Sequence, residues 1–141
     1  MTLKGIDPLL SGALLRALDE LGHGELLVVA DRNFPAYGND ATVIRIDTGV
    51  VEAVRAILTV FPLDTFVPTP IERMTASEDD PQTNPTQEEV LAVAIEAGGT
   101  DLAFRDIPRM SFYDRAAQSR VVVLTRETAP YCDFVLIKGM I

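Results

Sequence analysis

The chain of 141 residues has one cysteine, Cys132, and one histidine, His23. A single cysteine cannot form an intramolecular disulfide, and one cysteine with one histidine cannot make a His/Cys zinc site. The sequence also lacks the G-x-G-x-x-G and Walker A phosphate loops, the G-x-S-x-G nucleophile turn and the H-E-x-x-H metal motif. The sequence therefore gives no indication of a metal or an organic cofactor.

Positive charge is scarce and dispersed. Lysine and arginine number 12 against 21 acidic residues, which gives a formal net charge of −9. A negative field repels phosphate backbones, so we expect neither a nucleic-acid partner nor binding to an anionic membrane. The apolar runs are far shorter than a membrane span, and MTLKGIDPLL lacks the apolar core of a signal peptide. Together with the single cysteine, this predicts a cytoplasmic protein.

Length and composition are those of one globular domain, which we expect to cover residues 1–141. Hydrophobic residues make up 48% of the chain and charged residues 23%. Helical and strand patterns alternate, which predicts an α/β fold with a largely parallel β-sheet flanked by helices. The expected helices are 11–22, 50–61, 85–97 and 108–119, and the expected strands are 25–31, 41–47, 101–106, 121–125 and 134–138.

Local signals set the ends of several elements. Ser11 is expected to cap the first helix, and Gly22 to take a left-handed conformation after it. Asp47 or Thr48 is expected to cap the second helix. Asn84-Pro85 with Gln87 is a helix-start signature. Prolines 62, 68 and 70 predict an irregular or edge segment over 65–76, followed by a surface loop over 76–86.

The stretch LGHGELLVVAD places His23 in a turn between a helix and a strand, and Asp31 at the end of that strand. An imidazole can give and take protons near pH 7, and the flanking glycines allow a ligand to approach closely. A turn histidine can equally well hydrogen-bond a backbone carbonyl. Asp31 can cap the following turn or bind a polar ligand, since ligands of such sheets lie beyond the carboxyl ends of strands.

Two further segments carry candidate binding residues. RMSFYDRAA places Arg109 on one side of a helix with Phe112 or Tyr113. A guanidinium beside a ring suits a sugar, although an ordinary amphipathic helix also explains the pattern. Tyr131 and Asp133 lie just before the last strand, where packing is the plainer reading, and Cys132 between them is expected to be a small buried residue.

Taken together, four segments resemble the family of L-fucose mutarotases and D-ribose pyranases. They are LGHGELLVVAD, NFPAYGND followed by VIRID, RMSFYDRA, and PYCDFVLIKG. They occur in the family's order and at its spacing, and they are most similar to the fucose branch.

The resemblance implies a cofactor-independent isomerase of carbohydrate metabolism, of the racemase and epimerase class, that interconverts the α and β anomers of L-fucose or a related monosaccharide. It implies that His23 is the proton donor, that Asp31 and Arg109 bind sugar hydroxyls, and that residues 131–133, with Tyr113, line the pocket. It also implies a homodecameric ring with sites near subunit contacts. A pyranase acting on ribose-like sugars and a non-catalytic sugar-binding protein are the alternatives.

One departure from the family and one distance qualify this expectation. Asp133 stands where the family has asparagine, so an acceptor-only carboxylate replaces an amide when it is ionised. Eight residues of strand span up to about 26 Å, so His23 and Asp31 cannot meet within one subunit unless the chain bends. A neighbouring subunit that completes the site would resolve this.

Overall fold

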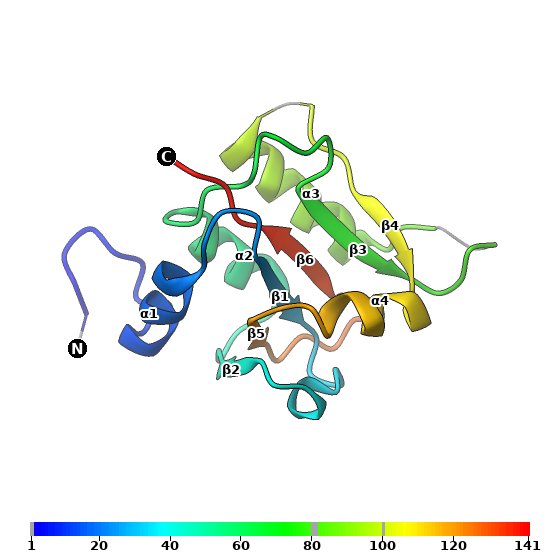
Figure 1. The fold of residues 1–141 in the computed structure, drawn as a ribbon, viewed down its shortest axis with the longest axis horizontal. Coiled ribbons are helices and arrows are strands. Elements are labelled where there is room, and N and C mark those ends of the chain that lie inside the picture. The colour runs from blue at the N-terminus through cyan, green and yellow to red at the C-terminus, as the bar shows by residue number, and fades with distance from the viewer. Residues whose placement is uncertain (1, 80–81, 100) are drawn as a thin grey trace.

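The computed structural model describes residues 2–79, 82–99 and 101–141, and its strands form one six-stranded sheet in the order β2-β5-β1-β6-β3-β4. Figure 1 shows the arrangement. The strands are β1 Leu26–Ala30, β2 Thr42–Arg45, β3 Ile71–Thr75, β4 Arg105–Pro108, β5 Val121–Leu124 and β6 Phe134–Ile137. The helices are α1 Gly12–Glu20, a 3₁₀ turn at Ala36–Gly38, α2 Val50–Leu58, α3 Pro85–Gly98 and α4 Arg109–Ala116.

One strand runs against all the others. β1 pairs in parallel with β5, and β5 with β2, while β3 pairs in parallel with β4. β6 lies between β1 and β3 and is antiparallel to both. The five parallel strands therefore end at one border of the sheet, here called the carboxyl edge, and begin at the other, the amino edge. The prediction of a largely parallel α/β sheet is confirmed.

Both faces of the sheet are covered, which is why β1 is buried at every position. Leu27 and Val29 join the core that α1, α2 and α3 form on one face. Val28 and Ala30 point to the opposite face and pack with residues of α4 and of the loop after β1. Figure 1 shows α2 and α3 behind the sheet and α4 in front of it. None of the helices in the described segments is long and apolar enough to cross a membrane.

Two of the predicted helix caps are confirmed. The Ser11 side chain accepts a hydrogen bond from the backbone N–H of Leu14 at the start of α1. At α3 the Asn84 side chain accepts from the Gln87 N–H, and the Gln87 side chain accepts in return from the Asn84 N–H. This reciprocal pair satisfies two backbone donors that no helical carbonyl reaches.

The end of α1 differs from the prediction. Gly24, with φ +83°, takes the left-handed conformation that was expected of Gly22. The chain leaves the helix in an extended conformation at Leu21, and the Glu25 carboxylate accepts the Gly22 N–H at 2.7 Å. The left-handed residue therefore follows His23 and turns the chain into β1.

The start of α2 also differs. Neither Asp47 nor Thr48 caps the helix, because Gly49 occupies the cap position and has no side chain to donate or accept. The missing acceptor comes from elsewhere in the sequence. Glu127 accepts the Val50 N–H at 3.2 Å, across a separation of 77 residues.

The prediction of an irregular or edge segment over 65–76 was wrong in its second half. Ile71–Thr75 forms β3, an interior strand that is buried at every position. Its sequence IERMT does not suggest a buried strand, because Glu72 and Arg73 are charged. Both side chains are nevertheless buried, with exposed fractions of 0% and 5%. Charged groups are buried at such positions only when they are paired.

Both charges of β3 have partners. Two oxygens of Glu72 accept from the Arg115 guanidinium at 2.8 and 3.0 Å, and Arg105 adds a third contact at 3.2 Å. Arg73 makes a two-pronged contact with Asp106 at 2.7 and 3.2 Å. These planar pairs tie β3 to β4 and to α4.

The strand after α3 lies later than predicted, at Arg105–Pro108 rather than 101–106. Pro108 ends β4 and precedes α4, where the sequence predicted it as the first helical residue. β4 is the last strand of the sheet, and an edge strand tolerates a residue with no N–H to donate.

Replacing Glu72 should destabilise the fold far more than replacing a surface carboxylate. Glu72→Ala leaves the Arg115 guanidinium, whose side chain is 26% exposed, without its charged partner, and we expect a loss of about 2–3 kcal/mol in the free energy of unfolding. The control Glu52→Ala breaks an exposed pair with Arg55 and should cost about 0.5 kcal/mol or less. Urea unfolding monitored by circular dichroism measures both, and equal losses would contradict the assignment.

Candidate functional site

His23 lies at the amino edge of the sheet and is paired with a carboxylate. Its Nε2 lies 3.0 Å from Oδ1 of Asp64, a residue 41 positions later in the chain. The Asp64 side chain is 6% exposed, whereas the imidazole is 38% exposed. The ring is therefore held from one side and open on another. The histidine thus bonds a carboxylate and not the backbone carbonyl that was the plainer alternative.

The end of β6 fixes both members of this pair. The Gly24 N–H donates to the Lys138 carbonyl at 2.8 Å, which anchors the turn that carries His23. The Asp64 N–H donates to the Ile137 carbonyl at 2.9 Å, which anchors the other segment. The Gly139 N–H donates to Pro62 at 2.8 Å and completes the attachment. The approach is so close that a Cβ on Gly139 would lie 2.5 Å from the carbonyl oxygen of Leu63.

An aromatic ring stands beside the imidazole. The His23 and Phe66 rings are 5.1 Å apart at 74°, edge to face, and Phe66 is 72% exposed. The Phe66 N–H donates to Oδ1 of Asp64, and this bond is the main reason that the pKa of Asp64 lies below its ordinary value, with the His23 hydrogen bond second. Asp64 is therefore an ionised carboxylate at neutral pH.

Asp31 and Asp133 meet at the carboxyl edge, where β1 ends and β6 begins. The Asp31 N–H donates to Oδ1 of Asp133 at 2.8 Å, and the two residues are 7% and 3% exposed. Asp31 also accepts the Asn33 N–H at 2.9 Å, so it does close the following turn, as its structural alternative predicted. Burial, followed by the charge of Asp31, raises the pKa of Asp133 to about 8.

The neighbours of Asp133 differ from one another. Tyr131 is 37% exposed and has φ +57°, an uncommon left-handed conformation for a bulky residue. Its carbonyl accepts from the Gln87 side chain at 2.8 Å. Cys132 is fully buried, as the sequence predicted, and burial raises the pKa of its thiol to about 12. Its side chain faces the core, so only its backbone can reach a ligand.

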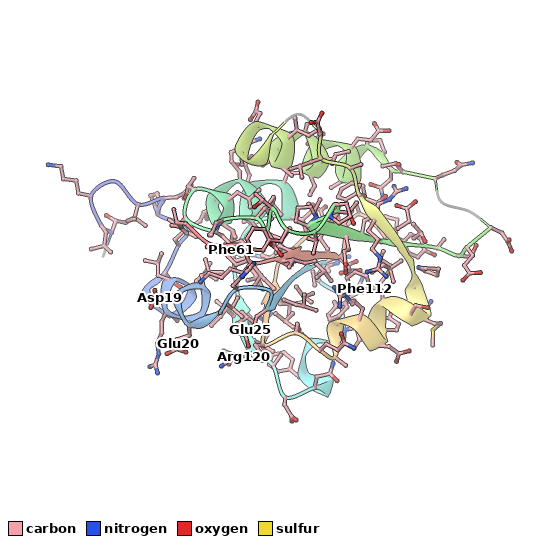
Figure 2. The ribbon with its side chains drawn as sticks, turned by 45° about the horizontal axis from the view of Figure 1, so that its top comes forward. Asp19, Glu20, Glu25, Phe61, Phe112 and Arg120 are labelled. Carbon is pink, nitrogen blue, oxygen red and sulfur yellow. The ribbon has the colours of Figure 1, made fainter. Side chains whose placement is uncertain are left out.

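Arg109 opens α4 and lies over the ring of Tyr113, with its guanidinium carbon 5.7 Å from the ring centre. Tyr113 in turn lies 5.9 Å from Phe34, in the loop that follows Asp31. Phe112, labelled in Figure 2, is fully buried and packs edge to face against the same Phe34 ring. Of the two aromatic residues that the helical spacing allowed, Tyr113 is thus the one beside the arginine.

The predicted residues thus form two groups at opposite edges of the sheet. His23 stands alone at the amino edge, and Asp31, Arg109, Tyr113 and the segment 131–133 gather at the carboxyl edge. A hollow of about 500 Å³ near the amino edge contains none of them; Phe61 and Asp19, labelled in Figure 2, line two of its walls. Within the described ranges, no cluster of three or more histidine, cysteine or carboxylate side chains could hold a metal ion.

Asp64 is the member of the arrangement that the sequence did not reveal. It lies in PLDTF, among prolines, where an aspartate normally closes a turn, and it does so here through Phe66. Its partnership with His23 arises only because β6 runs backwards between β1 and β3. The one signal in the sequence that pointed to such a residue was general: a single histidine needs a hydrogen-bond partner to hold one of its ring nitrogens.

Comparison with known proteins finds relatives that match this chain over nearly its full length. The chain is 37% identical over 139 residues to a protein named L-fucose mutarotase from Actinobacillus pleuropneumoniae serotype 5b (strain L20), covering 98% of this chain and 96% of that one. The FucU structure from Bifidobacterium longum superposes with a TM-score of 0.89 at 38% identity, covering 98% and 99%.

A third relative was solved with a sugar. The fucose mutarotase from Streptococcus pneumoniae, in complex with L-fucose, superposes with a TM-score of 0.90 at 30% identity and covers 99% of both chains. The RbsD / FucU transport protein family model matches residues 4–141. The chain therefore belongs to the RbsD / FucU family.

Proposed function

We propose that the protein is a mutarotase, an isomerase that interconverts the α and β anomers of L-fucose or a related monosaccharide. The observation that carries the proposal is the His23–Asp64 pair, a half-exposed imidazole held at 3.0 Å by a buried carboxylate. It occurs in a chain that is similar over nearly its full length to proteins named L-fucose mutarotase.

The reaction needs little besides a proton carrier. The bond between the anomeric carbon and the ring oxygen breaks, and its electron pair stays on the ring oxygen, which takes a proton from His23. The anomeric hydroxyl gives its proton to water, and the electron pair of that bond forms the carbonyl. Ring closure on the other face reverses these transfers. One positioned acid/base group supplies about 10²–10⁴-fold acceleration, enough for a reaction that already proceeds in water.

The carboxyl edge supplies the proposed sugar anchors. Arg109 donates in a fixed fork, and its contact with Tyr113 leaves the guanidinium edge available for hydroxyls. Asp31 and Asp133 lie next to one another and bring two carboxyl groups to this edge. The left-handed Tyr131 supports this placement, because strained residues persist where the surroundings hold them, and they concentrate at ligand sites.

The separation of the two groups favours a site shared between subunits. His23 precedes β1 and Asp31 follows it, so a strand that is buried along its length stands between them. The exposed ring of Phe66 beside His23 is suited to cover by another copy. We therefore propose that the amino edge of one subunit meets the carboxyl edge of the next, in a ring that the family resemblance makes a homodecamer, and that this assembly works in the cytoplasm.

Asp133 bears on the choice of sugar. With its pKa raised to about 8, it is protonated at neutral pH and can donate one hydrogen bond while accepting others. A protonated carboxyl combines a donor with acceptors, as the amide of the family's asparagine does. The departure is therefore compatible with turnover, and a non-catalytic sugar-binding protein is the weaker alternative. A pyranase acting on ribose-like sugars remains the second enzyme candidate.

Saturation transfer between anomer signals in NMR tests the activity. The wild-type protein should accelerate exchange of L-fucose more than that of D-ribose, and His23→Ala should return exchange to the buffer rate while light scattering gives an unchanged mass. Faster exchange of D-ribose would favour the pyranase. Binding without exchange would favour the sugar-binding protein, and full exchange by His23→Ala would remove this residue from its proposed role.

A mixing experiment tests the shared site. His23→Ala and Arg109→Ala should each be inactive, but oligomers assembled from both should recover about a quarter of wild-type exchange, because that fraction of sites draws both intact residues from different subunits. Refolding the two variants together supplies the mixture, and refolding each alone supplies the control. A mixture as inactive as its components would contradict a shared site.

The carboxyl pair predicts a pH-dependent stability. The folded chain retains the Asp133 proton between its ordinary pKa of 3.8 and about 8, whereas the unfolded chain loses it, so stability falls as pH rises through this window. Asp133→Asn removes that loss, and its advantage in melting temperature over wild type should grow from pH 5 to pH 9. The exposed control Asp19→Asn should show a constant difference. An Asp133→Asn difference that is independent of pH would contradict the shift.

A further inference from the structure

The capping box of α3 is also bonded to the segment that precedes β6. Asn84 and Gln87 use their side-chain oxygens to cap the first turn of the helix. Their side-chain nitrogens face a different part of the chain. Nδ2 of Asn84 donates to the Pro130 carbonyl at 2.8 Å. Nε2 of Gln87 donates to the Tyr131 carbonyl, also at 2.8 Å. Two consecutive carbonyls are therefore bound by one capping box.

The amide of Gln87 has a single permitted orientation. The residue is 1% exposed, and its oxygen accepts from the Asn84 N–H at 3.3 Å and from the Arg73 guanidinium at 3.2 Å. Its nitrogen donates to the carbonyls of Met74, at 2.9 Å, and Tyr131. The first two partners can only donate and the last two can only accept, so exchanging the amide oxygen and nitrogen would break all of these bonds.

Arg73 fixes this amide from the side of the sheet. Its guanidinium is bound at two points by Asp106, at 2.7 and 3.2 Å, and it donates to the Thr83 hydroxyl at 2.6 Å. The Gln87 side chain is therefore connected through Arg73 to both β3 and β4. A buried polar network whose members are satisfied is rigid, so the amide of Gln87 is a fixed donor.

The segment bound by this donor has a conformation that a tyrosine rarely adopts. Tyr131 has φ +57° and is followed by two buried residues, Cys132 and Asp133. The left-handed turn thus leads the chain from the surface to the contact of Asp133 with Asp31. Left-handed backbone is unfavourable for any residue with a Cβ, so an unrestrained segment would populate other conformations. The two bonds from the capping box favour the observed one.

We propose that Gln87, assisted by Asn84, is a positioning residue that holds residues 131–133 in the conformation that the sugar binds. This rests on the proposed function, in which that segment lines the pocket. Gln87 acts only through the backbone that it holds, and His23 lies at the opposite edge of the sheet. Loss of this restraint should weaken sugar binding but barely change the rate at saturating sugar, because a sugar at high concentration selects the competent conformation.

Two acidic variants remove the restraint and keep the helix cap. Gln87→Glu retains an oxygen for the Asn84 N–H, but it has no N–H for the Tyr131 carbonyl while Arg73 keeps the new carboxyl ionised. Asn84→Asp likewise retains its oxygen and loses the donor to Pro130. The L-fucose concentration for half-maximal anomer exchange should rise about tenfold in Gln87→Glu and about threefold in Asn84→Asp, with maximal rates within about twofold of wild type.

The single cysteine reports on the same segment without any sugar. In protein labelled with ¹⁵N-cysteine, the one amide signal belongs to Cys132, whose N–H shares a peptide group with the Tyr131 carbonyl. Both acidic variants should shift this signal, because the carbonyl loses its donor or its neighbour does.

Ser11→Ala is the matched control. Ser11 caps α1 as Asn84 caps α3, and across the described residues its side chain bonds no carbonyl of residues 130–133. Loss of this cap should lower the melting temperature. It should leave both the Cys132 signal and the half-saturating sugar concentration unchanged, which separates the proposed restraint from a general loss of stability.

The outcomes distinguish this proposal from the mutarotase itself. If the wild type exchanges anomers, an unchanged half-saturating concentration in Gln87→Glu, or a fall in the maximal rate alone, would overturn the role of Gln87 and leave the mutarotase standing. A wild type that leaves all tested sugars at the buffer rate would overturn the mutarotase. The Cys132 signal then still decides whether Gln87 restrains the segment, and an unmoved signal would show that it does not. Should Gln87→Glu fail to fold, Asn84→Asp carries the same test.

Discussion

The reversed strand β6 is the constraint on which both halves of the candidate site depend. Its first residues bring Asp133 against the Asp31 backbone at one edge of the sheet, and its last residues hold the turns of His23 and Asp64 at the other. A parallel strand in this position would exchange these ends. Since β6 is hydrogen-bonded on both sides, to β1 and to β3, neither end can move without breaking the centre of the sheet.

Much of the fold was predictable because short segments of the sequence determine it. The apolar run of β1, the leucine spacing of α1 and the reciprocal cap at Asn84 each need only a short window of sequence, and the structure confirms all three. β3 was not predictable in this way. Its burial depends on arginines from β4 and α4 that neutralise Glu72, more than thirty residues away. The same applies to α2, whose first N–H is satisfied by Glu127.

The candidate site likewise combines features that short segments of sequence reveal with features that depend on distant residues. The motifs around His23 and Asp31 stand out in the sequence. Helical spacing limited the ring beside Arg109 to Phe112 or Tyr113, and only the structure shows that it is Tyr113. The direction of β6 could not be inferred from its composition, because a fully buried strand has the same apolar character in either direction. Without that direction, Asp64 is one of many loop aspartates. The roles proposed for these residues in sugar exchange come from chemistry and resemblance, and the geometry supplies their positions.

The tight contact at Gly139 has a consequence for the tolerance of this chain to change. Even alanine would place its methyl carbon 2.5 Å from a carbonyl oxygen, with two more backbone atoms within 2.9 Å. To relieve these contacts, the segment that contains Leu63 and Asp64 would have to move away from the sheet. A saturation library should therefore retain only glycine at this position, while the adjacent Met140, 63% exposed, should accept most of the twenty amino acids.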